Sequence, residues 1–467
     1  MRALIWFHRD LRTHDHAGLS WAREVGCEVT TVVLSPRSAS QHKLNFWHQS
    51  VTQFSGQLNE LGITLELAQG EAHIVIPELV RQKQIDIIIT HERMNFIDEQ
   101  ELQKVSNHIK VPMKVLGELT LYPSSLVNDL TITQLKPFTA FKNRLQRDYH
   151  VPIEQNKTLE SCKSTTSALA RLQHYVWDSK ACLHYHQTRN GMLAEDDSSK
   201  WSPHLALGTL SPRRIYFELQ KFTGIHGPSQ GVDALIYELI WRDYFKFLAK
   251  LQGASLFQRE GLRSTVSFSP QDPNLFESWQ RGETGEDFVD ANMRELWLTG
   301  WMSNRGRQNV ASYLAKTMRL DWTEGARWFA EHLIDEDPEN NWGNWQYLAG
   351  VGTDPRDRIF NVQKQAEDYD PKQEYRQRWL GGSDEIAERI LALLSTRSPQ
   401  ATICPSEVLA KEVKQDKVAM EEVRSTARRL YSQGLVCFTQ KGIEVSPYEA
   451  RGPVRLKKIQ TKTKVIE

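Results

Sequence analysis

The sequence lacks the patterns that several common classes of protein leave in their chains. Its five cysteines form no C-x-x-C spacing, which excludes the usual zinc and iron–sulfur ligand sets and a disulfide framework. No G-x-G-x-x-G and no P-loop occurs, so the usual phosphate cradles are absent. The first apolar run, residues 3–7, is too short for a signal peptide or a membrane span. We therefore expect a cytoplasmic protein with no metal site and no membrane contact, and we expect a monomer.

An excess of charge is also lacking, because 58 Lys and Arg balance 58 Asp and Glu. Any binding to nucleic acid must then come from a local basic patch rather than from a global field. Tryptophan is the residue in excess, and 11 of the 14 lie between Trp177 and Trp379. Either this region has a large aromatic core, or its indoles serve a planar cofactor, a nucleobase or electron transfer.

Residues 1–120 alternate short apolar runs with helical patterns. The runs ALIWF, EVTTVVL, ITLELA, DIIIT and MKVLG are rich in β-formers and show little alternation. This order predicts an α/β domain with a doubly wound parallel sheet that is covered on both faces. Residues 121–165 have weak periodicity and end in a Ser/Thr-rich stretch, so we expect an interdomain linker there.

Residues 166–380 predict an all-α domain. The stretch DALIYELIWRDYFKFLAKL, for example, has apolar residues at the three and four spacing of a buried helix. Gly381 and Gly382 then predict a boundary, and Ser383 predicts the start of the next helix.

Residues 383–458 predict a small winged-helix domain of three helices followed by a strand, a turn and a strand, and residues 459–467 form a basic tail. In such domains the third helix commonly enters the major groove of DNA. Here that helix carries Arg424, Arg428 and Arg429. The other basic residues near this end are Arg451, Arg455, Lys457, Lys458, Lys462 and Lys464. The pattern indicates either contact with duplex DNA or a solvated face of a protein-interaction module.

Polar motifs within the helical region are candidates for a binding site. Residues 185–192 and 197–214 supply hydroxyls, a lysine and backbone donors before a helix start, which suit phosphate oxygens but also ordinary caps and turns. Glu238 and Trp241 share a helix face, which could hydrogen-bond and stack a base. An ion-paired Glu beside a core Trp explains that spacing equally well.

Two arginines, Arg305 and Arg307, are two residues apart and cannot share a helix face. One can reach outward to a phosphate while the other turns inward to an acid. Asp335 and Asp337 are the candidate acids, because buried charges without partners are costly.

These motifs together resemble the photolyase/cryptochrome family. The segments TRNGM, SSKWSPHLALGTLSPR, LIWRDYF, VDANMREL, TGWMSNRGRQNVASYL and NNWGNWQYLAGVGTDPRDRIFN look like its DASH branch, and the similarity covers about residues 1–380. Residues 383–458 resemble a bacterial winged-helix domain of unknown function, which is not usual in that branch.

The resemblance implies a light-driven lyase of the deoxyribodipyrimidine photolyase type. Such a flavoprotein passes an electron from reduced FAD to cyclobutane pyrimidine dimers, and this branch prefers single-stranded or damaged DNA. The alternative is a blue-light receptor whose winged helix regulates transcription. A folate antenna such as methenyltetrahydrofolate stays open, because Glu92 is a poor candidate for its site.

For the cofactor, the resemblance implies that the FAD phosphates and ribityl chain are held by Tyr185, Ser198, Ser199, Lys200, Trp201 and Ser202. Asn341 would face flavin N5. Asp335 and Asp337 would lie by the isoalloxazine and its adenine side, with Arg307 balancing Asp335.

For the substrate, the resemblance implies that Glu238 hydrogen-bonds the dimer while Trp241 and Tyr347 stack on it. The residues implied for the flanking DNA backbone are Arg189, Asn304, Arg305 and Gln365. Trp345 and Trp322 match the inner and middle members of an electron-transfer chain. Phe268 stands where the outer Trp is expected, so we expect slow photoreduction or another exit, through Trp297 or Trp328.

Overall fold

The computed structural model describes residues 1–117, 119–153, 166–263, 272–354, 359–380, 384–398, 400–432, 435–445, 447, 450 and 452–459. Within these residues the chain forms two compact units. The first comprises Met1–Gln271 and Ser303–Ile359, and the second comprises Asp272–Met302 and the chain from Phe360 onward. No helix among the described residues is long and apolar enough to cross a membrane.

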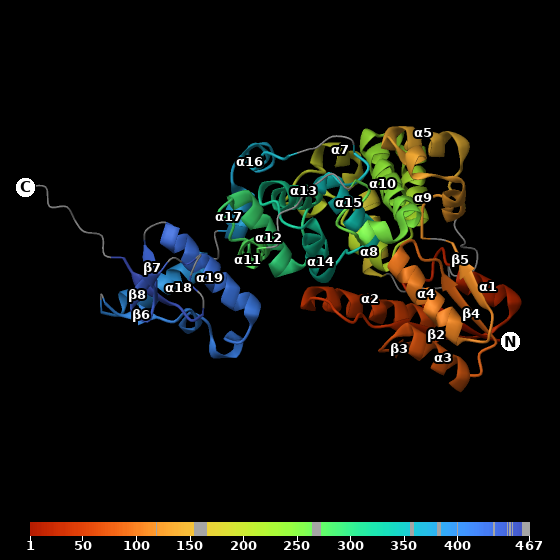
Figure 1. The fold of residues 1–467 in the computed structure, drawn as a ribbon, viewed down its shortest axis with the longest axis horizontal. Helices are drawn as coiled ribbons and strands as arrows, with labels where there is room; N and C mark the ends of the chain where they lie inside the picture. The colour runs from red at the N-terminus through yellow and green to blue at the C-terminus, as the bar shows by residue number, and fades with distance from the viewer. Residues whose placement is uncertain are drawn as a thin grey trace, which may run out of the picture. The chain divides into compact units, whose positions relative to one another are not determined.

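The first unit begins with a five-stranded parallel sheet of order β3-β2-β1-β4-β5 (Figure 1). Its strands are β1 (Arg2–Phe7), β2 (Glu28–Leu34), β3 (Leu65–Ala68), β4 (Ile87–His91) and β5 (Met113–Leu116). The helices between them are α1 (Ala17–Val25), α2 (Gln41–Glu60), α3 (Ala72–Gln82) and α4 (Phe96–His108). The predicted α/β domain with a parallel sheet is thus confirmed.

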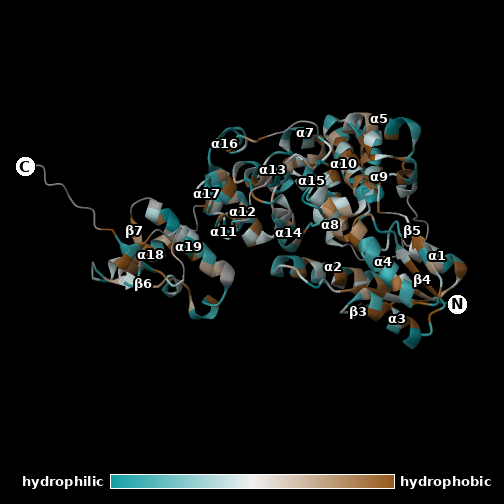
Figure 2. Ribbon diagram, viewed as in Figure 1, coloured by the Kyte–Doolittle hydropathy of each residue, from teal (hydrophilic) through white to brown (hydrophobic). Residues whose placement is uncertain are grey.

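The central strand β1 shows why its apolar run has no alternation. Ile5 and Phe7 belong to the core under α1 and α2, whereas Leu4 and Trp6 belong to the core under α3 and α4. Both faces of the strand are therefore buried, as in other parallel sheets. Strand β1 is accordingly apolar and buried from Ala3 to Phe7, whereas α3 and α4 mix hydrophilic and hydrophobic residues (Figure 2).

The rest of the first unit is helical, as predicted. Its helices are α5 (Phe138–Asp148), α6 (Ser167–Gln173), α7 (Tyr185–Thr188), α8 (Ser202–Leu207), α9 (Pro212–His226), α10 (Gln230–Gln252), α13 (Asn304–Ser312), α14 (Trp322–His332) and α15 (Pro338–Ala349). Short 3-10 segments lie at Ser124–Asp129, Ile132–Leu135, Ala181–Leu183, Glu195–Asp197 and Gly253–Phe257, and π-helical turns lie at His174–Asp178 and Tyr313–Thr317.

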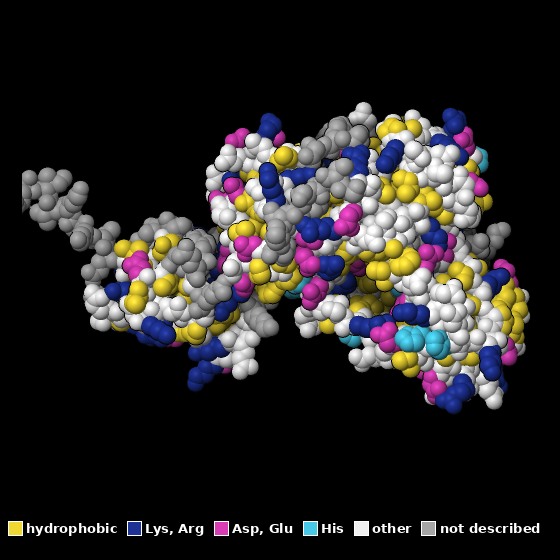
Figure 3. All heavy atoms as spheres, in the orientation of Figure 1, with side chains coloured by type: hydrophobic (Ala, Val, Ile, Leu, Met, Phe, Trp, Pro, Cys, Tyr) yellow, Lys and Arg dark blue, Asp and Glu magenta, His cyan; other side chains and the backbone are white. Residues whose placement is uncertain are grey.

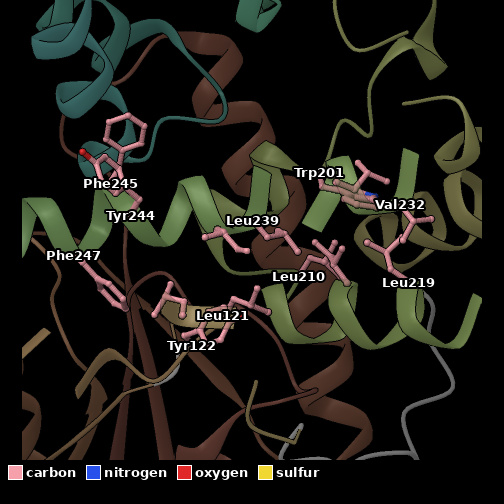
Figure 4. Close-up of a cluster of buried hydrophobic side chains, with 14 of the residues drawn as sticks. Leu121, Tyr122, Trp201, Leu210, Leu219, Val232, Leu239, Tyr244, Phe245 and Phe247 are labelled. Atoms are coloured by element: carbon pink, nitrogen blue, oxygen red, sulfur yellow. The ribbon is translucent and has the colours of Figure 1, made fainter. Parts of the chain in front are cut away.

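The longest helix, α10, organises the core of this region. Leu239 and Phe247 of α10 pack in one apolar cluster with Leu121 and Tyr122 from the segment after β5 (Figure 4). Residues 121–153, which the sequence predicts as the start of a linker, therefore contribute to the core rather than crossing the surface as free chain. The apolar positions Phe138, Phe141 and Leu145 of α5 account for the packing of this segment.

The second unit combines helices with a small antiparallel sheet of order β6-β9-β7-β8. Its helices are α11 (Pro273–Arg281), α12 (Asp287–Thr299), α16 (Val362–Tyr369), α17 (Glu374–Leu380), α18 (Asp384–Ser395) and α19 (Lys417–Ser432). Its strands are β6 (Thr402–Ile403), β7 (Val436–Gln440), β8 (Ile443–Val445) and β9 (Arg455–Lys458).

Two details of the second unit differ from the predicted winged helix. The expected middle helix is replaced by 3-10 turns at Pro405–Glu407 and Lys411–Val413, and the basic stretch around residue 457 forms strand β9. The unit also includes residues that precede the predicted boundary at residue 383, because α12 and α17 pack together. The Tyr375 hydroxyl of α17 hydrogen-bonds Asn292 Oδ1 at 2.9 Å and Glu295 Oε2 at 2.6 Å.

Candidate functional site

The predicted site residues gather around α15 in the first unit. Asp337 accepts the backbone N–H of Asn340, and Pro338 follows at the first helical position, so the helix begins there. Gly343 lets α15 approach α10, because a Cβ at that position would lie 2.4 Å from the Phe245 ring. Gly325 of α14 has the same role, since its Cβ would lie 2.4 Å from the ring of Trp345.

A pocket lies between α13, α14 and α15. Its walls include six of the predicted residues, namely Asn304, Arg307, Asp335, Asp337, Asn341 and Trp345. Apolar walls come from Phe329, Leu333 and Leu348. On the face shown in Figure 3, Lys and Arg side chains lie near α7 and α13, with Asp and Glu side chains among them. The structure brings an apolar lining and convergent polar groups together in this pocket, which is typical of a ligand site.

The two arginines of α13 point to different partners, as their spacing predicts. Arg307 Nη2 donates to both carboxylate oxygens of Asp335, at 2.9 and 2.8 Å. Arg305 instead donates to Gln308 Oε1 at 2.9 Å and to Asn190 Oδ1 at 3.0 Å. Arg307 thus fixes an acid in the pocket wall, whereas Arg305 lies beside the segment that follows α7.

Asn341 presents an acceptor to the pocket. Its Nδ2 donates to the carbonyl of Ala326 at 2.9 Å, and since a carbonyl only accepts, the amide orientation is determined by chemistry. The Oδ1 of Asn341 is then directed away from Ala326. An amide oxygen at this position can accept a hydrogen bond from a protonated ring nitrogen without adding charge.

Asp337 lies in a buried charge network that the sequence did not reveal. Lys246 Nζ contacts Asp337 Oδ2 at 3.0 Å and Glu339 Oε2 at 2.8 Å, and Arg242 Nε lies 3.7 Å from Asp337. Burial alone would raise the pKa of Asp337, but Lys246, a hydrogen bond with Glu339 and Arg242 hold that pKa well below its usual range. Asp337 is therefore ionised. The available signal in the sequence was Lys246, a charged residue between the apolar positions Phe245 and Phe247 of α10.

Glu238, predicted to contact the dimer, and Arg189, predicted to contact the flanking DNA backbone, are in direct contact. Arg189 Nη1 lies 2.6 Å from Glu238 Oε1, and each side chain is about one-third exposed. Burial raises the pKa of Glu238, and Arg189 lowers it in part. Tyr185 is close to the same pair, because Glu238 and Arg189 both influence its pKa. The structure thus joins α7 and α10 at an accessible carboxyl group.

Trp241 is half-buried beside Glu238, and its ring stacks on Phe138 with centroids 3.5 Å apart and planes 5° apart. This aromatic contact gives Trp241 a fixed orientation. Tyr347 lies on the partly exposed side of α15. Gln365 belongs to α16 in the second unit, so its predicted place in the site stays a prediction.

The segment 198–202 leads into α8, which begins at Ser202. Arg171 fixes the backbone at the start of this segment. The guanidinium donates to the carbonyls of Ser198 and Ser199 at 3.1 and 2.9 Å. The side chains of Ser198, Ser199 and Lys200 are partly exposed and that of Ser202 is exposed, which leaves their hydroxyls accessible. Lys200 adopts a positive φ of 55°, which turns the chain before Trp201.

Two buried polar atoms next to this segment are suited to contact a bound cofactor. The Nε1 of Trp201 and the hydroxyl of Tyr175 are buried without a hydrogen-bond partner among the described residues. Their rings contact each other edge to face, with centroids 5.4 Å apart. Since buried donors are nearly always satisfied, a polar group supplied by a cofactor is expected here. The predicted FAD residues therefore fit FAD by their chemistry.

The tryptophans predicted for electron transfer are buried in α14 and α15. Trp345 packs edge to face on Phe329 with centroids 5.1 Å apart, and Trp322 donates Nε1–H to the carbonyl of Arg259 at 2.9 Å. Trp328 stacks on His332. Trp297 is 38 % exposed in the second unit, and Phe268 lies outside the described residues.

A second cluster, Asp10, His16 and His91, has the spacing of a metal site but not its chemistry. His16 Nδ1 accepts the N–H of Leu19 at 3.1 Å and thereby caps α1. The proton of the neutral ring must then be on Nε2, which lies 3.0 Å from Asp10 Oδ2 and donates to it. Because that nitrogen has no free lone pair, His16 serves as a helix cap rather than as a ligand.

The predicted DNA-contacting helix, α19, requires a correction. Arg428 is only 7 % exposed, and its guanidinium forms ion pairs with Glu283 at 2.5 Å and with Glu421. A buried, doubly paired guanidinium cannot also reach a phosphate. Arg424 is the exposed arginine of this helix whose pairing is weak, with Glu421 at 3.5 Å. The sequence could not reveal the pair with Glu283, because the two residues are 145 positions apart.

Comparisons with known proteins identify the family that this chain resembles in sequence. Residues 3–159 match the DNA photolyase family model, and residues 235–433 match the model for the FAD binding domain of DNA photolyase. Cryptochrome DASH of Synechocystis is 37 % identical over 81 % of this chain and 87 % of its own length. Cryptochrome DASH of Danio rerio is 36 % identical over 79 % of this chain and 81 % of its own length.

Solved structures are similar as well. The crystal structure of Synechocystis cryptochrome superimposes with a TM-score of 0.74 at 35 % identity, over 81 % of this chain and 88 % of that one. An archaeal photolyase from Sulfolobus tokodaii, solved with two FAD molecules, has a TM-score of 0.67 at 27 % identity, over 85 % of this chain and 95 % of that one. The chain therefore contains a domain that binds FAD.

Proposed function

The chain belongs to the photolyase/cryptochrome family, and from that premise we propose that it is a light-driven DNA-repair lyase. Its substrates would be cyclobutane pyrimidine dimers, with a preference for single-stranded DNA. The observation that carries the proposal is the pair Glu238–Arg189, a partly exposed carboxyl group on the helix that also carries Trp241. A flavoprotein that only senses light has no evident need for this group.

Bound FAD would supply the electron that splits the dimer and would take it back afterwards, so the reaction is redox-neutral overall. In this chain Arg307 and Asp335 would fix one edge of the cofactor site, and Asn341 Oδ1 would accept a hydrogen bond from the ring. The unpartnered Nε1 of Trp201 would donate a hydrogen bond to the cofactor.

Glu238 would hold the substrate. Burial raises the pKa of Glu238 and so favours the neutral carboxyl group, which can donate a hydrogen bond to a carbonyl of the dimer. Arg189 would contact the flanking phosphate once the dimer displaces it from Glu238. Trp241 would present its ring to the dimer while Phe138 supports it.

Strand preference would follow from the cost of taking the dimer out of a duplex. Flipping a base pair costs a few kcal/mol in unstacking and unpairing, and a single strand avoids most of this cost. Tyr347 would add a smaller stacking surface than an indole on the other side of the pocket. The preference for single strands would therefore arise because the stacking contacts of the pocket are too small to offset the cost of opening a duplex.

The decisive experiment is repair of a defined thymine dimer under blue light, in single-stranded and in duplex oligonucleotides of the same sequence. The expected result is faster repair of the single strand, with no repair in the dark. Absence of repair in both substrates, with FAD fully bound and reduced, would refute the proposal.

Electron supply from outside would run through Trp345 and Trp322. Trp297 and Trp328 are candidates for the surface exit, and each can be changed to Phe while bleaching of the flavin under light is followed. Slower bleaching in one variant identifies the exit. Equal rates in both variants and in the parent would exclude both residues.

The alternative function is a blue-light receptor that regulates transcription through a C-terminal winged helix. The helix–sheet order of residues 384–459 supports it, but the burial of Arg428 leaves α19 with fewer groups for DNA. Repair activity together with unchanged duplex binding after substitution of Arg424 would count against this alternative.

A further inference from the structure

A second pocket lies in the first unit and shares no lining residue with the pocket around Asn341. It has a volume of about 650 Å³ and lies between α5, α9, α10 and the segment that follows β5. Small-molecule sites commonly have volumes of about 300–1,000 Å³. The cavity is thus large enough for a ligand of mononucleotide size.

Tyr122 forms the most buried wall of this pocket. The residue is 5 % exposed, and its backbone N–H donates to Asp243 Oδ2 at 2.9 Å, while the N–H of Leu121 donates to Oδ1 at 3.0 Å. Figure 4 shows Tyr122 and Leu121 next to each other in the core around α10. Asp243 therefore fixes the chain on which Tyr122 is presented.

The hydroxyl of Tyr122 has no hydrogen-bond partner among the described residues. Burial, with a smaller contribution from the neighbouring lining residue Tyr216, raises the pKa of Tyr122 to about 12. The group is thus a neutral donor in a polar cavity. A hydroxyl that lines a cavity and has no partner in the protein can donate to a ligand.

Aromatic faces and a cation form the adjacent wall. Tyr237 lies edge to face against Phe138, with centroids 5.2 Å apart, and Lys142 Nζ lies 5.5 Å from the centre of the Tyr237 ring. No carboxylate pairs with Lys142 within the described residues. Its charge is available to an anion, while the tyrosine rings are available for stacking.

The rim supplies groups that recognise polar edges. Gln146 and Gln220 are exposed at the pocket and can each donate and accept, as the edge of a nucleobase requires. His150 and Asp233 are also exposed at the rim. They suit a phosphate and a ribose hydroxyl respectively.

We propose that this pocket binds a nucleotide, with the base between the tyrosine rings and the phosphate toward Lys142. The Tyr122 hydroxyl donates to an acceptor on the base edge. The same chemistry is offered by a free mononucleotide and by a nucleotide of single-stranded DNA. Phe138 links this pocket to the proposed repair site, because it contacts Tyr237 with its edge and stacks on Trp241.

The test uses the full-length protein with FAD bound, so that the adenine side of the flavin site is already occupied. Binding of AMP and of dTMP is measured by calorimetry in the dark, which makes the result independent of repair. The expected result is saturable binding that weakens about tenfold in Tyr122→Phe and by a similar factor in Lys142→Gln. Tyr122→Phe keeps the ring, and therefore the packing, unchanged.

The control variant is Arg147→Gln on the same helix, whose side chain pairs with Asp148 and does not line the pocket. It should bind AMP as the parent does. Displacement of bound AMP by an undamaged oligothymidylate identifies DNA as the source of the nucleotide, and lack of displacement identifies the free nucleotide. No saturable binding in the parent, or equal binding in parent and Tyr122→Phe, overturns the proposal.

Discussion

Two clusters in this molecule each pair an arginine with largely buried acidic residues, but the two arginines differ in how much of the side chain is exposed. Around α15, Arg307 pairs with Asp335, and the arginine keeps 23 % of its side chain exposed beside a pocket. Around α19, Arg428 pairs with Glu283 and Glu421, and only 8 % of its side chain is exposed. A charged side chain can bind a ligand only if its ion-pair partner leaves part of that side chain accessible. We propose that the first cluster serves binding, whereas the second stabilises the fold.

The largest effect is expected when the open cluster is broken. Asp335→Ala leaves Arg307 without its bidentate partner, and breaking a buried ion pair costs about 3–5 kcal/mol. We expect most molecules to lose FAD, which absorbance of the purified protein measures directly. Glu324→Ala, which breaks an exposed pair with Arg327, is the matched control and should retain FAD. Equal FAD content in the two variants would contradict the assignment of Asp335.

Breaking the closed cluster should affect stability and leave FAD in place. Arg428→Ala leaves Glu283 buried without its cation, so we expect a loss of about 3 kcal/mol in the stability of the second unit. Chemical denaturation followed by tryptophan fluorescence measures this loss. Arg424→Ala removes a weak, exposed pair and should cost less than about 1 kcal/mol.

The same two variants separate structure from DNA binding. If α19 contacts DNA, Arg424→Ala reduces the slope of log affinity against log salt by about 1, since one phosphate contact is lost. Fluorescence anisotropy with a duplex oligonucleotide gives that slope. An unchanged slope in Arg424→Ala would remove the remaining support for the receptor.

The sequence predicted the open cluster better than the closed one, for a physical reason. Arg307 lies in α13, Asp335 in the turn between α14 and α15, and Asn341 in α15, and the resemblance of these motifs to the family implied a cofactor role for all three. Arg428 and Glu283 are 145 residues apart, and their contact depends on how distant segments of the second unit pack together. The parallel sheet was predictable because each strand carries its own apolar run. The linker after residue 120 was misjudged because its apolar residues follow no single period.

A third buried carboxyl group, Asp243, extends the comparison because its hydrogen-bond partners are backbone amides. Burial raises its pKa to about 6, with the N–H groups of Tyr122 and Leu121 opposing the shift. A raised pKa means that its stabilising contribution is present below about pH 4 and is lost as pH rises through 6. Asp243→Asn should remove up to about 3 kcal/mol of that pH dependence in urea titrations between pH 4 and 7.

The control for Asp243 is Asp148, which lies on the surface and has a pKa lowered by a hydrogen bond from Arg147. The sign is opposite for this group, since its small contribution is lost as pH falls. Asp148→Asn should therefore change the profile slightly and in the other direction. The same profile for parent and Asp243→Asn would contradict the raised pKa.

The smallest effect is expected at Glu238. Two substitutions of this one residue separate a hydrogen bond to the substrate from an ion pair with Arg189. If the neutral carboxyl group donates to the dimer, Glu238→Gln keeps a donor and should lower the repair rate by no more than about threefold. Glu238→Ala removes the donor and should lower it about tenfold, the value of a hydrogen bond of roughly 1.4 kcal/mol. Both variants should keep FAD, because Glu238 pairs with Arg189 and lies outside the pocket of Asn341. Equal repair rates for the Gln and Ala variants would mean that Glu238 donates no hydrogen bond to the dimer. Its role would then be to hold Arg189 by their ion pair, and Arg189 would be the residue that contacts the substrate.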